Sequence, residues 1–159
     1  MTVRAVLDTN TVISGLLWGG APHHALLAVE SGLVQLRSSP FLLWELSDTL
    51  TRKKFDRIIN LRGVNRSVLE THYRKLVDDV VEPDFVPVVI PGDPDDDQVL
   101  ACAVKANADV IVSGDAHLKE LKTYSGIPIM NAADFLGYLL ASDGDPVVFR
   151  RQTRLPATK

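Results

Sequence analysis

The sequence predicts an α/β fold, in which helices cover both faces of a central, mostly parallel sheet of about five strands. Short apolar runs alternate with longer segments of helical pattern along the chain, which is the order of elements in strand–helix–strand units. Three of the apolar runs lead into aspartate, as expected where buried strands reach the rim of a sheet. At 159 residues, 46% of them apolar, the chain is long enough for one domain with a hydrophobic core.

Glycine, proline and capping residues set the expected boundaries in the first part of the chain. Gly19 and Gly20 break a short first helix, and Pro22 suits the first turn of the next one. Ser39 followed by Pro40 provides an N-cap and a first-turn proline for a third helix. The expected elements are, in order, a strand at residues 3–7, a helix at 12–17, a helix from 22 to about 32, a strand at 33–36, and a helix from 40 through 50 to about 55.

The second part of the chain shows the same alternation. Gly63 interrupts the helical pattern, and Asp93 with Pro94 can begin a new helix. Asn131 can cap the last helix. The expected elements are a helix at residues 67–79, a strand at 85–90, a helix from 94 to about 107, a strand at 110–112, a helix at 118–124, a strand at 127–130 and a helix ending near 142. We place the domain at residues 1–142 and a weakly patterned, arginine-containing tail at 143–159.

Charge is distributed unevenly along the middle of the chain. Residues 52–75 contain eight basic side chains against two acidic ones, although the whole chain has a formal net charge of −3. A strongly acidic stretch follows at residues 78–97. A basic segment beside an acidic one suits a polyanionic substrate held next to a metal site, and a solvated helix face is the alternative.

Cysteine content and hydropathy exclude several classes of protein. Cys102 is the only cysteine, so an internal disulfide and a cysteine-based zinc site are excluded. It lies in the apolar string VLACAV and is expected to be buried. We expect no membrane-spanning segment, because no apolar run approaches about 18 residues. We also expect no secretion signal, since an aspartate occurs at position 8. A cytoplasmic protein is therefore expected.

Carboxylates follow the expected strands at the points where the strands end. Asp8 and Asp115 each follow an apolar run, and an aspartate cluster follows the run VPVVIPG. The carboxyl ends of parallel strands meet at one edge of the sheet, where open α/β folds bind ligands. Several carboxylates in one crevice repel each other unless a cation joins them. A hard divalent cation that takes oxygen ligands, such as Mg²⁺ or Mn²⁺, is therefore expected.

Each acidic position also has a structural interpretation. Asp8 could simply cap the following helix. Glu45 lies in the apolar block FLLWEL, so an unpaired carboxylate there would be costly. It points either into the crevice, which we favour, or toward Arg52 as an ion-pair partner. Asp115 follows Gly114 in a tight turn, where it could be a turn-forming residue beside the Ser113 hydroxyl.

The aspartate cluster contains more acids than helix capping requires. Asp93 is assigned to the N-cap, with Pro94 in the first turn. Asp96 is well placed to project over the sheet edge, and Asp97 is its competitor. The four histidines (His23, His24, His72 and His117) lack ligand spacing, and none is assigned to a metal.

Four stretches in order carry a resemblance to a known family: LDTNTVISGLL, SPFLLWELSDTL, DPDDDQVLACAVKANADVIVSGDAHLKEL and GIPIMNAADFL. The chain resembles a PIN domain, the metal-dependent nuclease fold that includes the VapC-type toxins of bacterial toxin–antitoxin pairs. The matching region runs over residues 3–140, almost the whole chain. Each motif is short, and the specificity comes from the ordered set. The resemblance is closest to the toxin subgroup.

The resemblance implies that Asp8, Glu45, Asp96 and Asp115 ligate one or two Mg²⁺ or Mn²⁺ ions and are the catalytic residues. Asp96 is preferred over Asp97 because it stands seven residues before Ala103, as in the family. Asp97 then has a supporting role, as do two polar residues that match supporting positions, Asn10 and Ser113. The resemblance also implies a homodimer and an antitoxin partner. The RNA-binding residues are not identified.

The expected function is a Mg²⁺/Mn²⁺-dependent endoribonuclease, the toxin of a type II toxin–antitoxin pair. Three alternatives remain at this point. The first is a housekeeping RNA-processing nuclease with the same site, and the second is an RNA- or protein-binding module that does not cut. The third is an aspartyl-phosphate phosphatase with Asp8 as nucleophile. The third is disfavoured because Asn10 occupies the position where such enzymes usually have a second aspartate.

Overall fold

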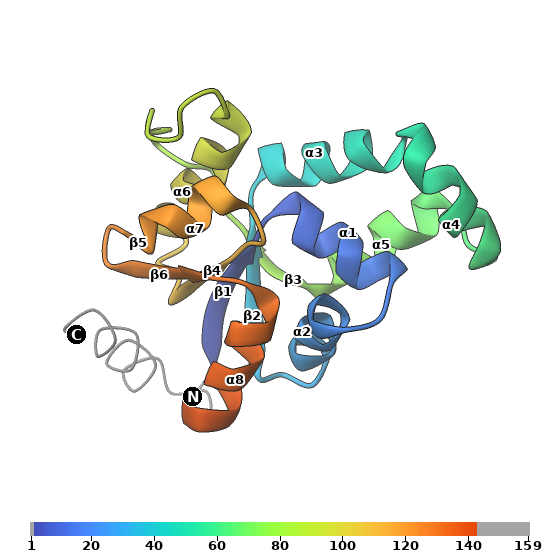
Figure 1. The fold of residues 1–159 in the computed structure, drawn as a ribbon, viewed down its shortest axis with the longest axis horizontal. Helices are drawn as coiled ribbons and strands as arrows, with labels where there is room; N and C mark the ends of the chain where they lie inside the picture. The colour runs from blue at the N-terminus through green and yellow to red at the C-terminus, as the bar shows by residue number, and fades with distance from the viewer. Residues whose placement is uncertain (1, 143–159) are drawn as a thin grey trace.

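Six strands form one sheet in the order β3-β2-β1-β4-β6-β5 (Figure 1). In the computed structural model, which describes residues 2–142, the strands are β1 (Val3–Leu7), β2 (Val34–Ser38), β3 (Val77–Val80), β4 (Val110–Val112), β5 (Thr123–Tyr124) and β6 (Ile127–Met130). Neighbouring strands run parallel, except that β5 is antiparallel to β6. The predicted α/β fold with a mostly parallel sheet is confirmed, with six strands where about five were expected.

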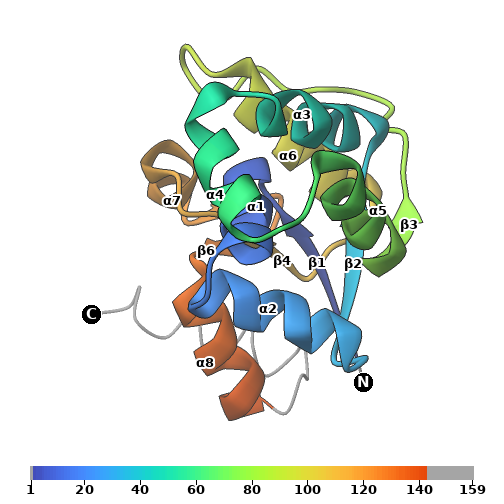
Figure 2. The same cartoon turned by 90° about the vertical axis from the view of Figure 1, so that its right-hand side faces the viewer.

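Helices cover both faces of this sheet (Figure 2). They are α1 (Thr9–Leu17), α2 (Ala21–Glu30), α3 (Pro40–Leu50), the 3₁₀ helix η1 (Lys53–Phe55), α4 (Asp56–Leu61), α5 (Arg66–Leu76), α6 (Pro94–Lys105), α7 (Ala116–Leu121) and α8 (Ala132–Ser142). Val3, Ala5 and Leu7 of β1 pack into the core shared with α1, α2, α3, α5 and α8. Val6 packs into the second core, with α6 and α7. Strand β1 is therefore buried on both faces, as in a three-layer α/β/α fold.

The order of the strands creates a crevice at the carboxyl ends of β1 and β4. From β1 the chain passes through β2 to β3 on one side, then returns to β4 on the other side of β1. The connections after β1 and β4 therefore leave in opposite directions. Such a switch point is where open α/β sheets bind their ligands.

Close contact between α1 and α2 fixes the helix that begins at this crevice. A Cβ atom at Gly15 would lie 2.8 Å from both the Leu26 Cδ1 atom and the Pro22 carbonyl oxygen. Only a glycine allows α2 to approach α1 this closely. This close packing against α2 positions α1, whose first residue, Thr9, lines the crevice.

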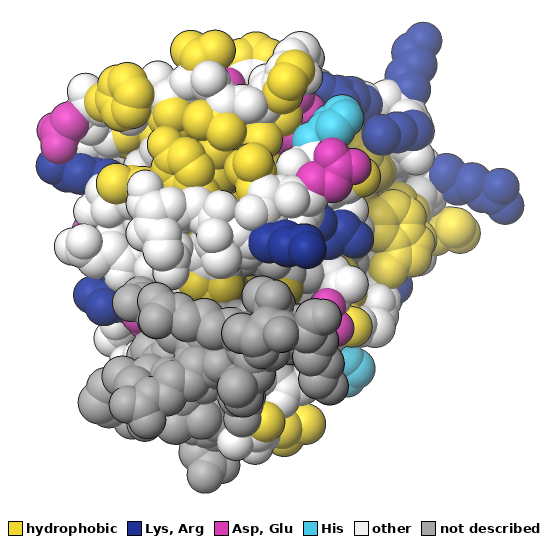
Figure 3. Space-filling model, turned by 60° about the vertical axis from the view of Figure 1, so that its left-hand side comes forward, with side chains coloured by type: hydrophobic (Ala, Val, Ile, Leu, Met, Phe, Trp, Pro, Cys, Tyr) yellow, Lys and Arg dark blue, Asp and Glu magenta, His cyan; other side chains and the backbone are white. Residues whose placement is uncertain are grey.

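The strand predicted at residues 85–90 is wrong. No strand is present there; the third strand is instead β3, and its first three residues were predicted to end the helix at 67–79. Pro87 has no N–H to donate to a neighbouring strand, and Phe85 and Val88 are 71% and 98% exposed. Hydrophobic side chains gather on the face shown in Figure 3, which carries α6, α7 and the segment before α6.

Strand β3 forms because of its pairing with β2 rather than its own hydrophobicity. Arg37 of β2 binds Asp78 and Asp79 of β3, with N–O distances of 2.7 and 3.7 Å. This ion pairing holds an edge strand whose residues are mostly exposed. Helix α5 therefore ends at Leu76, earlier than its pattern predicted.

Other boundaries also differ from the prediction, among them the start of α1 at Thr9 and the end of β2 at Ser38. Helix α3 ends at Leu50, and the segment to Phe55 contains the separate 3₁₀ helix η1. Helix α4 was not predicted as an element of its own. Helix α7 occupies Ala116–Leu121, and the short strand β5 takes residues assigned to that helix.

Two expectations concern the chain as a whole. Within residues 2–142 no single helix has the length and apolar character to cross a membrane, although the bent pair α1 and α2 passes by length and composition alone. The tail expected at residues 143–159 lies outside the described residues.

Candidate functional site

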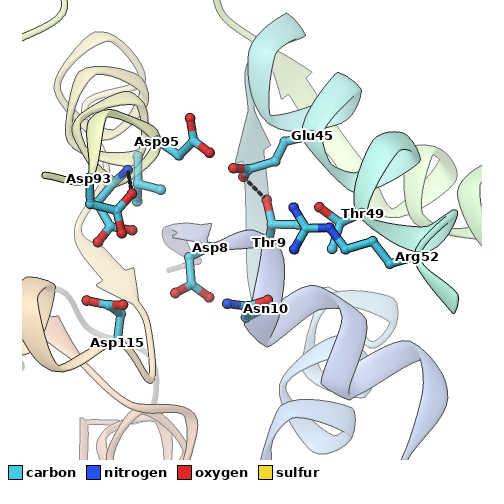
Figure 4. A pocket seen from close by; sticks show the side chains of 11 residues that line it. Asp8, Thr9, Asn10, Glu45, Thr49, Arg52, Asp93, Asp95 and Asp115 are labelled. Carbon is cyan, nitrogen blue, oxygen red and sulfur yellow. Dashed lines mark hydrogen bonds between the residues drawn. The ribbon is translucent and has the colours of Figure 1, made fainter. Parts of the chain in front are cut away.

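A cavity of about 210 Å³ opens at the carboxyl ends of β1 and β4 (Figure 4). Its lining includes one cation, Arg52, and six carboxylates: Asp8, Glu45, Asp93, Asp95, Asp96 and Asp115. The acids come from the ends of β1 and β4, from the middle of α3 and from the start of α6. All four sequence-predicted ligands are thus brought to one crevice.

Asp8 lies at the centre of the crevice (Figure 4) and is 5% exposed. Its backbone N–H donates to the Val112 carbonyl oxygen at 3.1 Å, which joins the ends of β1 and β4. Its Oδ1 atom accepts from the Thr11 N–H at 2.8 Å, and its Oδ2 atom accepts from the Ser113 hydroxyl. Burial raises the pKa of Asp8, against the lowering effect of these hydrogen bonds. Asp8 is therefore both the cap of α1 and a crevice carboxylate.

Glu45 projects from α3 toward the opposite wall of the crevice. The Thr9 hydroxyl donates to its Oε1 atom, and its other close neighbour is the Asp95 carboxyl group. Burial, followed by Asp95 and the charge of Asp8, raises the pKa of Glu45 to about 7. Among the described residues Glu45 has no ion pair with Arg52, which was the structural alternative.

Asp93, Asp96 and Asp115 form the tightest group of acids. One ligand atom from each, together with a ring nitrogen of His117, lies within 4.8 Å of the others. Burial raises the pKa of Asp96 to about 8, helped by the negative charges of Asp115 and Asp93. The Asp96 Oδ2 atom is buried and has no hydrogen-bond partner.

These residues fit a divalent cation. A buried carboxylate oxygen without a donor is costly, and the pKa values of Glu45 and Asp96 are raised first by burial and then by neighbouring acids. A cation among the oxygens would satisfy the Asp96 oxygen and relieve the repulsion between the acids. The carboxylate donors suit a hard ion such as Mg²⁺ or Mn²⁺.

The three predicted supporting residues lie in different places. Ser113 is fully buried, donates to Asp8 and accepts from the Asp115 N–H at 3.0 Å, so it connects two acids. Asn10 is exposed in the first turn of α1 and lines the crevice. Asp97 does not line it. The Asp97 Oδ1 atom accepts from the N–H groups of Val89 and Ile90 at 3.0 and 2.9 Å.

Three residues of the site were given no ligand role from the sequence: Asp93, Asp95 and His117. Asp93 caps α6, accepting from the Asp96 N–H at 3.4 Å, but it also belongs to the tight group. Asp95 borders Glu45. His117, to which no metal role was given, has its Nδ1 atom 3.9 Å from Asp115 Oδ1. Its position two residues after Asp115, in the first turn of α7, was the available signal.

Comparison with known proteins agrees with this architecture. The sequence model of the family described as PIN domain matches residues 4–117, a range that contains every acid lining the crevice. No curated protein matched the chain.

Proposed function

The chain belongs to the PIN domain family, and from that premise we propose that it is an endoribonuclease acting as the toxin of a type II toxin–antitoxin pair. PIN domains are in general metal-dependent nucleases, and the acidic cluster of this chain fits that chemistry. The observation that carries the proposal is the buried Asp96 oxygen without a hydrogen-bond partner, beside the carboxylates of Asp93 and Asp115.

The proposed ligands are Asp8, Glu45, Asp96 and Asp115, with Asp93 and His117 beside them. One or two Mg²⁺ or Mn²⁺ ions, when bound there, would supply a water activated for attack and would stabilise charge on the scissile phosphate and the leaving oxygen. The ligands come from four separate elements, so the fold itself sets their spacing.

The chain's own residues orient the carboxylates. Ser113 holds one oxygen of Asp8 while the Thr11 N–H holds the other, so this carboxylate has little rotational freedom. The Thr9 hydroxyl, at the start of α1, holds one oxygen of Glu45. Such positioning supports catalysis because a ligand held in its working orientation needs no reorganisation.

The test is cleavage of total RNA by the purified protein. We expect cutting with Mg²⁺ or Mn²⁺, none with EDTA, and a loss of orders of magnitude in Asp8→Asn and Asp96→Asn. Asp48→Asn is the matched control, because Asp48 is an exposed acid of α3 outside the crevice. No cutting by wild type, or unchanged cutting by both crevice variants, would contradict the nuclease assignment.

The toxin role, the antitoxin partner, the homodimer and the cytoplasmic location are parts of the same proposal and need their own test. Expression of the chain should arrest growth, and co-expression of a small protein encoded beside it should relieve the arrest. A housekeeping RNA-processing nuclease would cut RNA through the same site without any such partner. Absence of arrest with active protein would favour that second function.

A further inference from the structure

Arg52 is the one basic side chain among the residues that line the acidic crevice. It follows the end of α3 and precedes η1, and its backbone is held on both sides. The Arg52 N–H donates to the Thr49 carbonyl oxygen at 3.1 Å, and the Arg52 carbonyl oxygen accepts from the Phe55 N–H at 3.0 Å. Figure 4 shows the side chain reaching back past Thr49 toward Thr9 and Glu45.

The guanidinium of Arg52 has no ion pair or hydrogen bond within residues 2–142. Other basic residues are matched to acids: Arg37 to Asp78, Arg66 to Asp56 and Lys105 to Asp84. An arginine beside six carboxylates would be expected to pair with one of them if its role were structural. Its guanidinium, which has five N–H donors, instead lines the crevice without a partner among the described residues.

We propose that Arg52 binds a phosphate of the RNA backbone and so seats the substrate against the carboxylates, an inference that rests on the proposed nuclease function. A guanidinium presents paired N–H donors that match two oxygens of a phosphodiester. The acids alone repel RNA, and a cation neutralises only those that it contacts. Arg52 supplies attraction from the wall opposite the tight group of Asp93, Asp96 and Asp115 (Figure 4).

The surface next to Arg52 carries further positive charges that would attract the RNA backbone. Lys53, Lys54 and Arg57 are exposed on η1 and α4 directly after it. Lys54 lies over the Phe55 ring at 5.0 Å from its centre, which holds that charge in place. A row of positive charges therefore extends from the crevice along η1. Of these basic residues, only Arg52 lines the crevice itself.

The experiment measures RNA binding and cleavage for Arg52→Ala, Arg52→Lys and Arg62→Ala. Arg62 is exposed in the same basic segment and outside the crevice, so its removal changes the net charge equally. Binding of a short labelled single-stranded RNA of mixed sequence is followed by anisotropy with Ca²⁺ in place of Mg²⁺, and a gel checks that the RNA stays intact.

We expect Arg52→Ala to weaken RNA binding at least about tenfold and to reduce the slope of log affinity against log salt by about 0.7. Arg52→Lys should lie between the alanine variant and wild type. In cleavage of total RNA with Mg²⁺, Arg52→Ala should raise KM more than it lowers kcat. Thermal unfolding should be unchanged, because the side chain has no structural partner.

Two results separate the inference from its premise. If wild type cuts RNA but Arg52→Ala and Arg62→Ala have the same affinity and KM, the Arg52 assignment is overturned and the nuclease proposal stands. If wild type neither binds nor cuts RNA, the nuclease proposal itself is overturned.

Discussion

At the scale of single residues, the carboxylates that would bind a metal lower the stability of the folded protein when no metal is bound. Asp96 is largely buried beside Asp93 and Asp115, and one of its oxygens has no donor. Asp8 and Glu45 add two more carboxyl groups whose pKa values are raised chiefly by burial. Such a group destabilises the folded state whenever it is charged and no cation is bound. The site is therefore built for a ligand rather than for stability.

This conflict predicts that the metal-free protein loses stability as pH rises. Folding raises the pKa of Glu45 to about 7 and that of Asp96 to about 8. Between their ordinary pKa values near 4 and these raised values, the folded protein holds protons that the unfolded chain has released, so stability falls with increasing pH. Thermal unfolding in EDTA should show a lower Tm at pH 8 than at pH 6.

The matched variant for the pH experiment is Asp96→Asn, which cannot become charged. It should flatten the fall in Tm and raise the metal-free Tm at pH 8, by about 2–4 °C for each kcal/mol of repulsion relieved in a chain of this size. Asp48→Asn should leave both unchanged. A metal-free Tm that rises between pH 6 and pH 8 would contradict the account.

At the scale of elements, local chemistry determined what was predictable. A helix cap was the structural interpretation of Asp8 and a turn that of Asp115, and both side chains accept N–H groups of the following residues. Each of these caps is formed by residues within three positions of one another, so it can be predicted from the local sequence. The two core strands β1 and β4 were predictable in the same way, because four of the five residues of β1 and all three of β4 are apolar.

Elements that depend on distant partners were not predictable. Strand β3 exists through pairing with β2 and through Arg37, forty residues or so away in the chain. The contact between Asp95 and Glu45, and the direction of Arg52 into the crevice, depend on how α3 and α6 are placed across the sheet edge. The positions of the four predicted acids followed from topology, whereas these additions required the three-dimensional arrangement.

The start of α6 predicts different outcomes for two neighbouring acids. Asp97 Oδ1 holds the N–H groups of Val89 and Ile90, so Asp97→Asn, which keeps an acceptor oxygen, should leave stability and metal binding nearly intact. Asp97→Ala leaves both N–H groups unpaired and should cost about 1–3 kcal/mol. Asp96→Asn should instead abolish the rise in Tm caused by Mg²⁺ or Mn²⁺. The measurement is thermal unfolding with and without metal.

The opposite result for Asp96 and Asp97 would contradict the proposal that Asp96 is the metal ligand. If Asp97→Asn abolished the metal-induced rise in Tm and Asp96→Asn preserved it, Asp97 would be the ligand. The alanine variant at Asp97 separates the two effects, since its loss of stability should appear equally with and without metal.

At the scale of the whole molecule, the crevice joins segments that are distant in the chain. The acids come from the turn after β1, from α3, and from the starts of α6 and α7, on both sides of the central strand (Figure 1). The PIN domain match spans the same segments. A cation held by all of them would act as a cross-link between the two layers of helices, in addition to its chemical role.

Hydrogen exchange measured with and without Mg²⁺ tests this cross-link. Because ligand binding favours closed states over locally opened ones, we expect slower exchange at the β1–α1 turn, around Glu45 in α3, and in the first turns of α6 and α7 together. Asp96→Asn should show none of these changes. Protection confined to α6 and α7 would mean that Asp93, Asp96, Asp115 and His117 hold the ion alone. That result would remove Glu45 from the ligands while leaving it as a neighbour of the Asp95 carboxyl group.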